Sequence, residues 1–197
     1  MKPVLLQPFF EIFDYYKPTT ICEIGTHDGK SAVQFIDHCL QYQKNLKYTG
    51  YDIFDAVKSN EKFHAKEVNG KGAGKFTTAK NNLKHRQKKK NKFSFELIVG
   101  FTKDTLVEST YDFVYIDGGH SYKTVKQDYE KLKTSKVIVF DDYQINGVAR
   151  FFDELVETNN IPKVEWNNVW KHKKPCWAFM PHSDKVKIHV QPVIFNA

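Results

Sequence analysis

Residues 19–31 read Thr-Thr-Ile-Cys-Glu-Ile-Gly-Thr-His-Asp-Gly-Lys-Ser, and this stretch decides the fold. Its first six residues are mostly β-branched or apolar, which is typical of a buried strand, and Gly25 to Gly29 predict a turn into a helix. Apolar residues then recur at helical spacing: Ala32, Val33, Phe35, Ile36, Cys39 and Leu40. A strand that turns into an amphipathic helix is the first half of a βαβ unit, so the segment predicts a parallel sheet.

The same alternation continues along the chain and places it in the α/β class. Further strands are predicted at 48–53, 95–99, 112–117 and 136–141. Amphipathic helices are predicted around 122–132 and 148–156. Three late strands, near 164–170, 176–180 and 186–193, favour an antiparallel edge. We therefore expect a single domain over residues 1–197, with a mostly parallel sheet and helices on both faces.

Composition narrows the class of protein further. With 197 residues, 41% of them hydrophobic and 15% aromatic, the chain can build a core, which excludes general disorder. No apolar run approaches the roughly 18 residues of a membrane span. The apolar stretch near the start of the sequence is interrupted by Pro3, Pro8, Glu11 and Asp14, so we expect no export signal. Three cysteines without a CxxC pair argue against a disulfide scaffold and a cysteine zinc site, and favour a cytoplasmic location.

The basic charge is concentrated in one segment. Residues 58–92 contain eleven lysines and one arginine against two glutamates, a net charge of +10, which leaves −3 for the rest of the chain. Glycines at 70, 72 and 74 favour a flexible loop, so we interpret residues 56–92 as a basic insertion after the second strand. Its charge is either solvated or forms a cover that recruits an anionic substrate, such as a phosphorylated sugar or a nucleic acid.

Polar residues at the strand ends are the candidate ligand-binding groups, because open α/β sheets bind ligands beyond the carboxyl ends of their strands. Gly25 and Gly29 allow a tight turn close to a ligand, although their spacing is neither GxGxxG nor a P-loop. Asp52 ends the second strand, where a carboxylate can accept hydrogen bonds from both hydroxyls of a ribose. A plain strand-to-helix turn and a loop-capping aspartate are the alternatives.

The next strand ends carry a second group of polar residues. Asp117 and His120 follow one strand, and Asp141 and Asp142 follow the adjacent one. Three carboxylates that converge without a lysine or arginine repel one another unless their pKa values rise or a divalent cation lies among them. Oxygen ligands favour Mg²⁺, Ca²⁺ or Mn²⁺. Helix capping by Asp117 and Asp142, with His120 exposed, is the alternative.

Together these motifs resemble the class I S-adenosylmethionine-dependent methyltransferases, and most closely the metal-dependent O-methyltransferases of the macrocin type and their cephalosporin hydroxylase-like relatives. The resemblance covers residues 19–156 and rests on the segments 23–31, 116–128 and 139–143. It implies a Rossmann-like methyltransferase fold with a seven-stranded sheet. One departure is Thr134-Ser135-Lys136, where the family has a glycine pair before the fifth strand.

The resemblance also implies the roles of individual residues. For S-adenosylmethionine, the implied cofactor-binding residues are Glu23, Gly25, Thr26, Gly29, Ser31, Asp52 and Asp117. For Mg²⁺ or another divalent cation, the implied ligands are Asp117, Asp141 and Asp142. His120 is implied as the general base, with Asp117 beside it as a catalytic residue.

The sequence therefore predicts metal-assisted O-methylation of a small hydroxylated substrate, anionic or sugar-like if the basic segment recruits it. Two other functions stay open. The chain could be a basic nucleic-acid-binding or nucleic-acid-modifying protein on the same fold, or an oxidative enzyme that uses the same ligands for iron. We expect no membrane partner, and the sequence leaves the oligomeric state open.

Overall fold

A computed structural model describes residues 7–55, 67, 74–90, 92–159, 164–167 and 175–181. Its centre is a seven-stranded sheet in the order β3-β2-β1-β4-β5-β7-β6. The strands are β1 (Thr20–Ile24), β2 (Leu46–Asp52), β3 (Phe93–Val99), β4 (Phe113–Ile116), β5 (Val137–Phe140), β6 (Val164–Asn167) and β7 (Pro175–Pro181). β1 to β5 are parallel, β7 is antiparallel to β5, and β6 is antiparallel to β7. The predicted fold class is confirmed, and the strand predicted near 186–193 lies outside the described residues.

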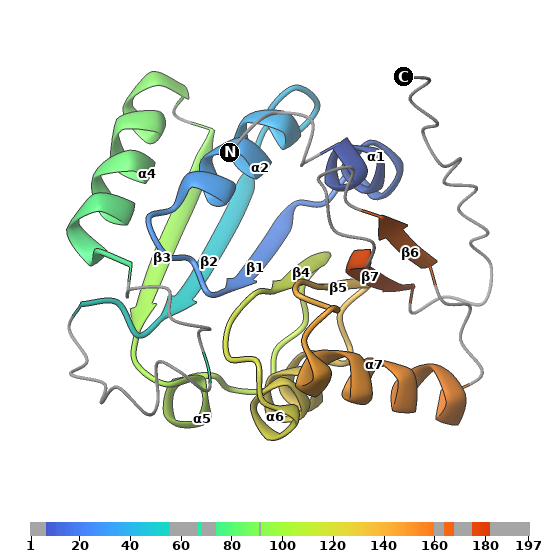
Figure 1. The fold of residues 1–197 in the computed structure, drawn as a ribbon. Helices are drawn as coiled ribbons and strands as arrows, with labels where there is room; N and C mark the ends of the chain where they lie inside the picture. Colours follow the sequence, from blue (N-terminus) through green and yellow to red (C-terminus); the bar gives the residue numbers. More distant parts are fainter. Residues whose placement is uncertain are drawn as a thin grey trace, which may run out of the picture.

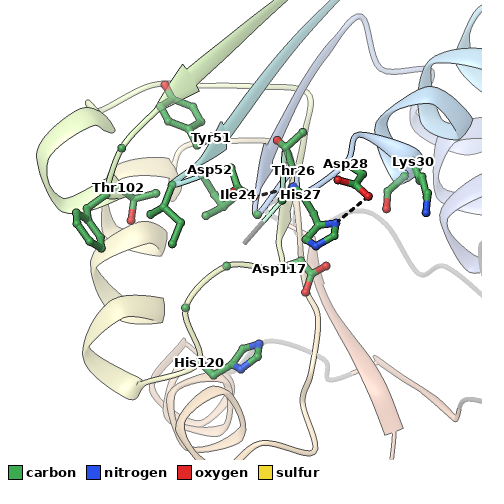
Figure 2. A pocket seen from close by; sticks show the side chains of 18 residues that line it. Ile24, Thr26, His27, Asp28, Lys30, Tyr51, Asp52, Thr102, Asp117 and His120 are labelled. Atoms are coloured by element: carbon green, nitrogen blue, oxygen red, sulfur yellow. Dashed lines mark hydrogen bonds and ion pairs between the residues drawn. The ribbon is translucent and has the colours of Figure 1, made fainter. Parts of the chain in front are cut away.

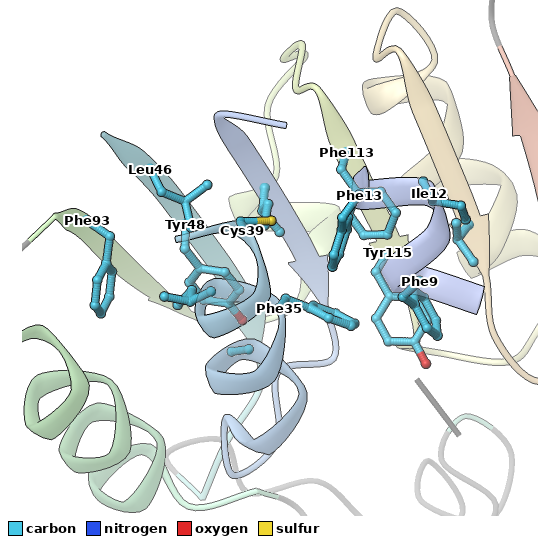
Figure 3. Packing of buried hydrophobic residues seen from close by; sticks show 14 of the residues in the cluster. Phe9, Ile12, Phe13, Phe35, Cys39, Leu46, Tyr48, Phe93, Phe113 and Tyr115 are labelled. Atoms are coloured by element: carbon cyan, nitrogen blue, oxygen red, sulfur yellow. The ribbon is translucent and has the colours of Figure 1, made fainter. Parts of the chain in front are cut away.

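Helices cover both faces of the sheet (Figure 1). They are α1 (Gln7–Tyr16), α2 (Lys30–Cys39), α4 (Phe76–Lys90), α5 (Thr102–Thr105), α6 (Tyr122–Leu132) and α7 (Asn146–Asn159). On one face, α1, α2 and α4 contribute buried side chains to one hydrophobic cluster, which also contains Ile21 of β1 (Figure 3). On the other face, α6 and α7 pack on even-numbered positions such as Cys22 and Ile24. This alternation follows from the two-residue period of a strand that is buried on both sides.

Helix α4 corrects the prediction for the basic segment. Residues 76–90 form a helix between β2 and β3 rather than a flexible loop, and Ala79 and Leu83 are its buried residues. Residues 56–66 and 68–73 of the predicted insertion lie outside the described residues. Lys88, Lys89 and Lys90 end the helix just before β3 begins, which places them away from the carboxyl ends of the strands. At the C-terminus of the helix, their positive charges interact favourably with the negative end of the helix dipole. This position gives no support to an active-site cover made of these three lysines.

The turn before β5 is built without the glycine pair of the family. Ser135 is fully buried, and its main-chain N–H donates to Leu132 O over 2.9 Å. Its hydroxyl accepts a hydrogen bond from the Tyr111 N–H at 3.1 Å, and Lys136 N–H donates to Tyr111 O at 3.0 Å. A serine side chain therefore ties this turn to the segment that enters β4.

Asp112 stabilises the end of the sheet at which the parallel strands begin, opposite to their carboxyl ends. Its carboxylate accepts hydrogen bonds from Thr19 N–H at 2.8 Å, Thr19 Oγ1 at 2.7 Å and Thr20 N–H at 3.1 Å. Lys136 Nζ donates to the other oxygen at 2.5 Å. Although burial raises the pKa of Asp112, these hydrogen bonds lower it below its ordinary value of 3.8. The carboxylate thus joins β1, β4 and the start of β5.

Within the described residues, no helix combines the length and the apolar character that a membrane crossing requires.

Candidate functional site

The candidate site lies where the strand order reverses. The chain runs outward from β1 to β2 and β3, then returns to β4 and β5 on the other side of β1. At this point a cavity of about 290 Å³ opens at the carboxyl ends of the strands. In Figure 2, Asp52 and Thr102 lie on one side of the cavity, and Asp117 and His120 lie farther down in the view.

The turn after β1 requires glycine. Gly25 has φ of 90°, and its N–H donates to Tyr51 O at 2.8 Å. A Cβ at this position would overlap the main-chain carbonyl of Asp117, whose own N–H donates to Ile24 O at 2.8 Å. The loops after β1 and β4 are therefore in main-chain contact. Gly29, with φ of 71°, begins α2 and shapes the turn, but it is not a lining residue of the cavity.

Asp52 lines the cavity with a fixed carboxylate. Its Oδ2 accepts a hydrogen bond from His27 N–H at 2.7 Å, and its Oδ1 accepts one from Phe54 N–H at 2.6 Å. His27 and Phe54 both have positive φ, so two strained residues hold this carboxylate in place. A carboxylate has about four lone-pair sites, which leaves about two for a ligand.

Glu23 lies behind the cavity rather than on its wall. Its side chain is 1% exposed and accepts a hydrogen bond from the Tyr48 hydroxyl, which also contacts Thr26 Oγ1 at 3.2 Å. Burial raises the pKa of Glu23 to about 8; the Tyr48 hydrogen bond lowers it and the charge of Asp52 raises it. Of the residues predicted to bind the cofactor, Gly25, Thr26, Ser31, Asp52 and Asp117 line the cavity, whereas Glu23 and Gly29 support the turn.

Sequence reasoning missed part of the lining. Gly100, Phe101 and Thr102 follow β3 and close the cavity beside Asp52. Open α/β sheets bind ligands beyond the carboxyl ends of their strands, and this applies to β3 as well as to the strands considered above. The sequence therefore contained enough information to include these three residues. Tyr51 and Ile53 also line the cavity, but as strand residues they carried no signal separate from that of the core.

The acid group differs from the predicted set in one member. Ligand atoms of Asp117, His120 and Asp142 lie within 4.8 Å of one another, so His120 takes the place predicted for Asp141. His120 is 6% exposed, and its Nε2 lies 2.8 Å from Asp142 Oδ2. The buried Nδ1 of His120 has no hydrogen-bond partner in the part of the chain that the structure describes.

Asp141 lies beside this group with both oxygens engaged. The Tyr115 hydroxyl donates to Oδ2 at 2.5 Å, and the Asp142 N–H donates to Oδ1 at 2.8 Å. Burial raises the pKa of Asp141 and the charge of Asp142 raises it further, while the Tyr115 hydrogen bond lowers it.

The donor set fits a divalent cation. Two carboxylates converge with an imidazole that has an unpartnered buried nitrogen, and a cation would relieve the repulsion between the acids. Carboxylates suit Mg²⁺ and Mn²⁺, whereas imidazole suits transition metals. The two carboxylates are therefore suited to Mg²⁺ or Mn²⁺.

Comparison with known proteins identifies the family. A family model described as "Methyltransferase domain" matches residues 22–143, which include the turn after β1 and the acid group. The chain belongs to this methyltransferase family. The match spans more than half of the sequence and confirms its identification as a class I S-adenosylmethionine-dependent methyltransferase.

Solved methyltransferases share the fold at low sequence identity. The O-methyltransferase TomG from Streptomyces achromogenes, involved in tomaymycin synthesis and solved in complex with SAM, has a TM-score of 0.62 and 14% identity; the match covers 92% of this chain and 80% of that one. An O-methyltransferase from Bacillus cereus in complex with SAH has a TM-score of 0.56 and 16% identity, over 91% of this chain and 80% of that one. A comparison with curated proteins finds no match.

Proposed function

We propose that this methyltransferase transfers the methyl group of S-adenosylmethionine to a hydroxyl of a small molecule, with help from a divalent cation. The observation that carries the proposal is that Asp117 and His120, two members of the acid–imidazole group, line the same cavity as the glycine turn and Asp52. A methyl donor in this cavity lies directly beside groups that can bind a cation and take a proton.

The cavity wall divides into parts that match the parts of the cofactor. Thr26 and Ser31, at the turn after β1 and the start of α2, surround the methionine part, where free N–H groups of the helix end favour a carboxylate. Asp52 binds the ribose hydroxyls with its remaining lone pairs. Phe101 and Thr102 lie beside Asp52 and contact the base. The sulfonium then faces Asp117, whose negative charge attracts it.

The transfer is an in-line displacement. The substrate hydroxyl gives up its proton, its oxygen attacks the methyl carbon, and the carbon–sulfur bond breaks with its electron pair passing to sulfur. The products are the methyl ether, S-adenosylhomocysteine and a proton. When bound, a divalent cation supplies a Lewis acid that lowers the pKa of a hydroxyl beside it.

His120 accepts the proton at Nδ1. Its Nε2 faces Asp142 at 2.8 Å, so the carboxylate orients the ring and stabilises the imidazolium that forms. Nδ1 has no partner among the described residues and is available to the substrate. Asp117 and Asp142 are the residues that would hold the cation. Asp141 is left out of the proposed cation site because it is not one of the residues whose ligand atoms lie within 4.8 Å of one another.

The test measures binding and transfer separately. Calorimetry gives the affinity for S-adenosylmethionine with and without Mn²⁺, and isotope-labelled cofactor reports transfer to a panel of catechols, sugars and sugar phosphates. We expect His120→Ala to lose about 10²- to 10⁴-fold in rate, the usual contribution of a general base, with cofactor affinity nearly unchanged. His85→Ala, which removes an exposed histidine of α4, is the matched control.

Two results would overturn the proposal. If the wild-type protein does not bind S-adenosylmethionine, the cavity has another ligand. If His120→Ala weakens cofactor binding as much as it slows transfer, His120 belongs to the cofactor site. If chelation of metal ions leaves the rate of methyl transfer unchanged, the reaction does not need a cation, and the proposal of methyl transfer still holds.

A further inference from the structure

Tyr115 links the hydrophobic core to the acid group. It lies on β4 and is 5% exposed, and its ring packs edge-to-face against Phe9 at 5.0 Å and Phe35 at 5.7 Å between ring centroids. Figure 3 shows Tyr115 beside Phe9, in the cluster under α1 and α2. Its hydroxyl leaves this apolar environment and donates to Asp141 Oδ2 at 2.5 Å. The ring is therefore fixed by packing while its polar end reaches the site.

Asp141 passes this constraint on to Asp142. Asp141 Oδ1 accepts a hydrogen bond from the main-chain N–H of Asp142 at 2.8 Å. Asp142 has φ of 55°, a left-handed conformation that a residue with a side chain adopts only when its surroundings impose it. In this conformation its Oδ2 lies 2.8 Å from His120 Nε2.

Two other contacts act on Asp142. Ile145 N–H donates to Asp142 O at 2.7 Å, and Gln144 Nε2 donates to Asp142 Oδ1 at 2.6 Å. Both come from the segment that leads into α7. These two contacts engage the main-chain carbonyl of Asp142 and one of its carboxylate oxygens. The main-chain N–H of Asp142 is instead bonded to the Asp141 carboxylate.

We propose that Tyr115 is a positioning residue: its hydroxyl orients the Asp141 carboxylate, which in turn fixes Asp142 against His120. The inference rests on the proposed function for the role of Asp142 and His120, but the chain of contacts that it describes exists without a bound cation. The sequence alone does not indicate it, because a tyrosine inside an apolar strand reads as a core residue.

The substitution Tyr115→Phe separates the packing of the ring from the positioning role of the hydroxyl. It keeps the ring that contacts Phe9 and Phe35 and removes only the hydroxyl. Asp141 then loses one of its donors, and a partly buried carboxylate that lacks a donor turns toward another or takes up a proton. In either case the hydrogen bond to Asp142 N–H is weakened, and the acid group loses its fixed geometry.

The experiment compares Tyr115→Phe with Tyr129→Phe. Tyr129 is a buried tyrosine of α6 that packs against Phe140 and Phe151, so the control removes the same atom elsewhere in the core. We expect Tyr115→Phe to weaken Mn²⁺ binding by about 10- to 100-fold, the usual effect of losing a group that orients a metal ligand. In the metal-free protein, the ring-nitrogen NMR signals of His120 should shift toward a mixture of tautomers. Affinity for S-adenosylmethionine and the thermal midpoint should match those of the control.

The outcomes distinguish this inference from the proposed function. Wild-type Mn²⁺ affinity together with wild-type His120 signals in Tyr115→Phe overturns the inference and leaves the proposed function intact. If the wild-type protein binds no Mn²⁺, the cation part of the proposed function fails, and the His120 signals alone decide the inference. If Tyr115→Phe is insoluble, Asp141→Asn replaces it, with the same expected shift of the His120 signals and the same refuting result.

Discussion

The buried carboxyl of Glu23 makes this methyltransferase less stable as the pH rises. The unfolded chain ionises this carboxyl near its ordinary pKa of 4.5, whereas burial raises the pKa to about 8 in the folded protein. Between these values the folded state holds a proton that the unfolded state has lost. The contribution of Glu23 to stability is therefore fully present below about pH 4.5 and is lost as the pH rises to about 8.

The size of the effect follows from the same two values. A difference of one unit in pKa corresponds to about 1.4 kcal/mol, so the raised pKa of Glu23 corresponds to at most about 5 kcal/mol of unfolding free energy. Glu23→Gln removes the titration, and its amide oxygen can still accept the hydrogen bond from Tyr48. We therefore expect the glutamine variant to match the wild-type protein near pH 5 and to be more stable by several kcal/mol at pH 8.5.

Urea unfolding at both pH values measures this difference. Glu108→Gln, which removes an exposed glutamate, controls for the change in net charge. Because each comparison is made against the wild-type protein at the same pH, other titrating groups cancel. If Glu23→Gln changes stability equally at pH 5 and pH 8.5, Glu23 is not held neutral by burial, and the reasoning is wrong.

Three further predictions concern residues that line the cavity or stabilise the sheet around it. Asp52→Ala should weaken S-adenosylmethionine binding by at least about tenfold in calorimetry, since it removes a charge-assisted acceptor for the ribose; unchanged affinity would contradict that role. Gly25→Ala should destabilise the protein by more than about 3 kcal/mol in urea unfolding, because its Cβ overlaps the Asp117 carbonyl, whereas a folded variant of normal stability would show that the turn adapts. Asp112→Ala should cost about 2–4 kcal/mol and leave cofactor affinity unchanged, since Asp112 lies at the opposite edge of the sheet; a loss of affinity in the folded variant would count against this separation.

The sheet could be predicted because its strands are apolar, β-branched and separated by clear turns, but the helices α1 and α4 could not. In α4, Ala79 and Leu83 are the buried residues of a fifteen-residue segment rich in lysine, so a helical apolar pattern is barely visible. In α1, the proline at position 8 suggested an interruption, although proline is compatible with the first turn of a helix. In each case the packing of the helix on the sheet outweighs a weak local signal.

The site was predictable to the level of strand ends but not of side-chain directions. Parallel strands bring Asp52, Asp117 and Asp142 to one edge, and the sequence is sufficient for that conclusion. Which of Asp141 and Asp142 faces His120 depends on the left-handed conformation of Asp142. That conformation depends on contacts across the sheet that no local pattern encodes.

The main-chain contact between Gly25 and Asp117 joins the turn after β1 to the loop that carries the acid group. The turn touches the carbonyl of Asp117, and the Asp117 N–H donates to Ile24 O. The relative position of these two loops is therefore held by the backbone of the adjacent strands β1 and β4. Because in-line displacement depends on fixed alignment of its reactants, this main-chain contact supports the proposed reaction.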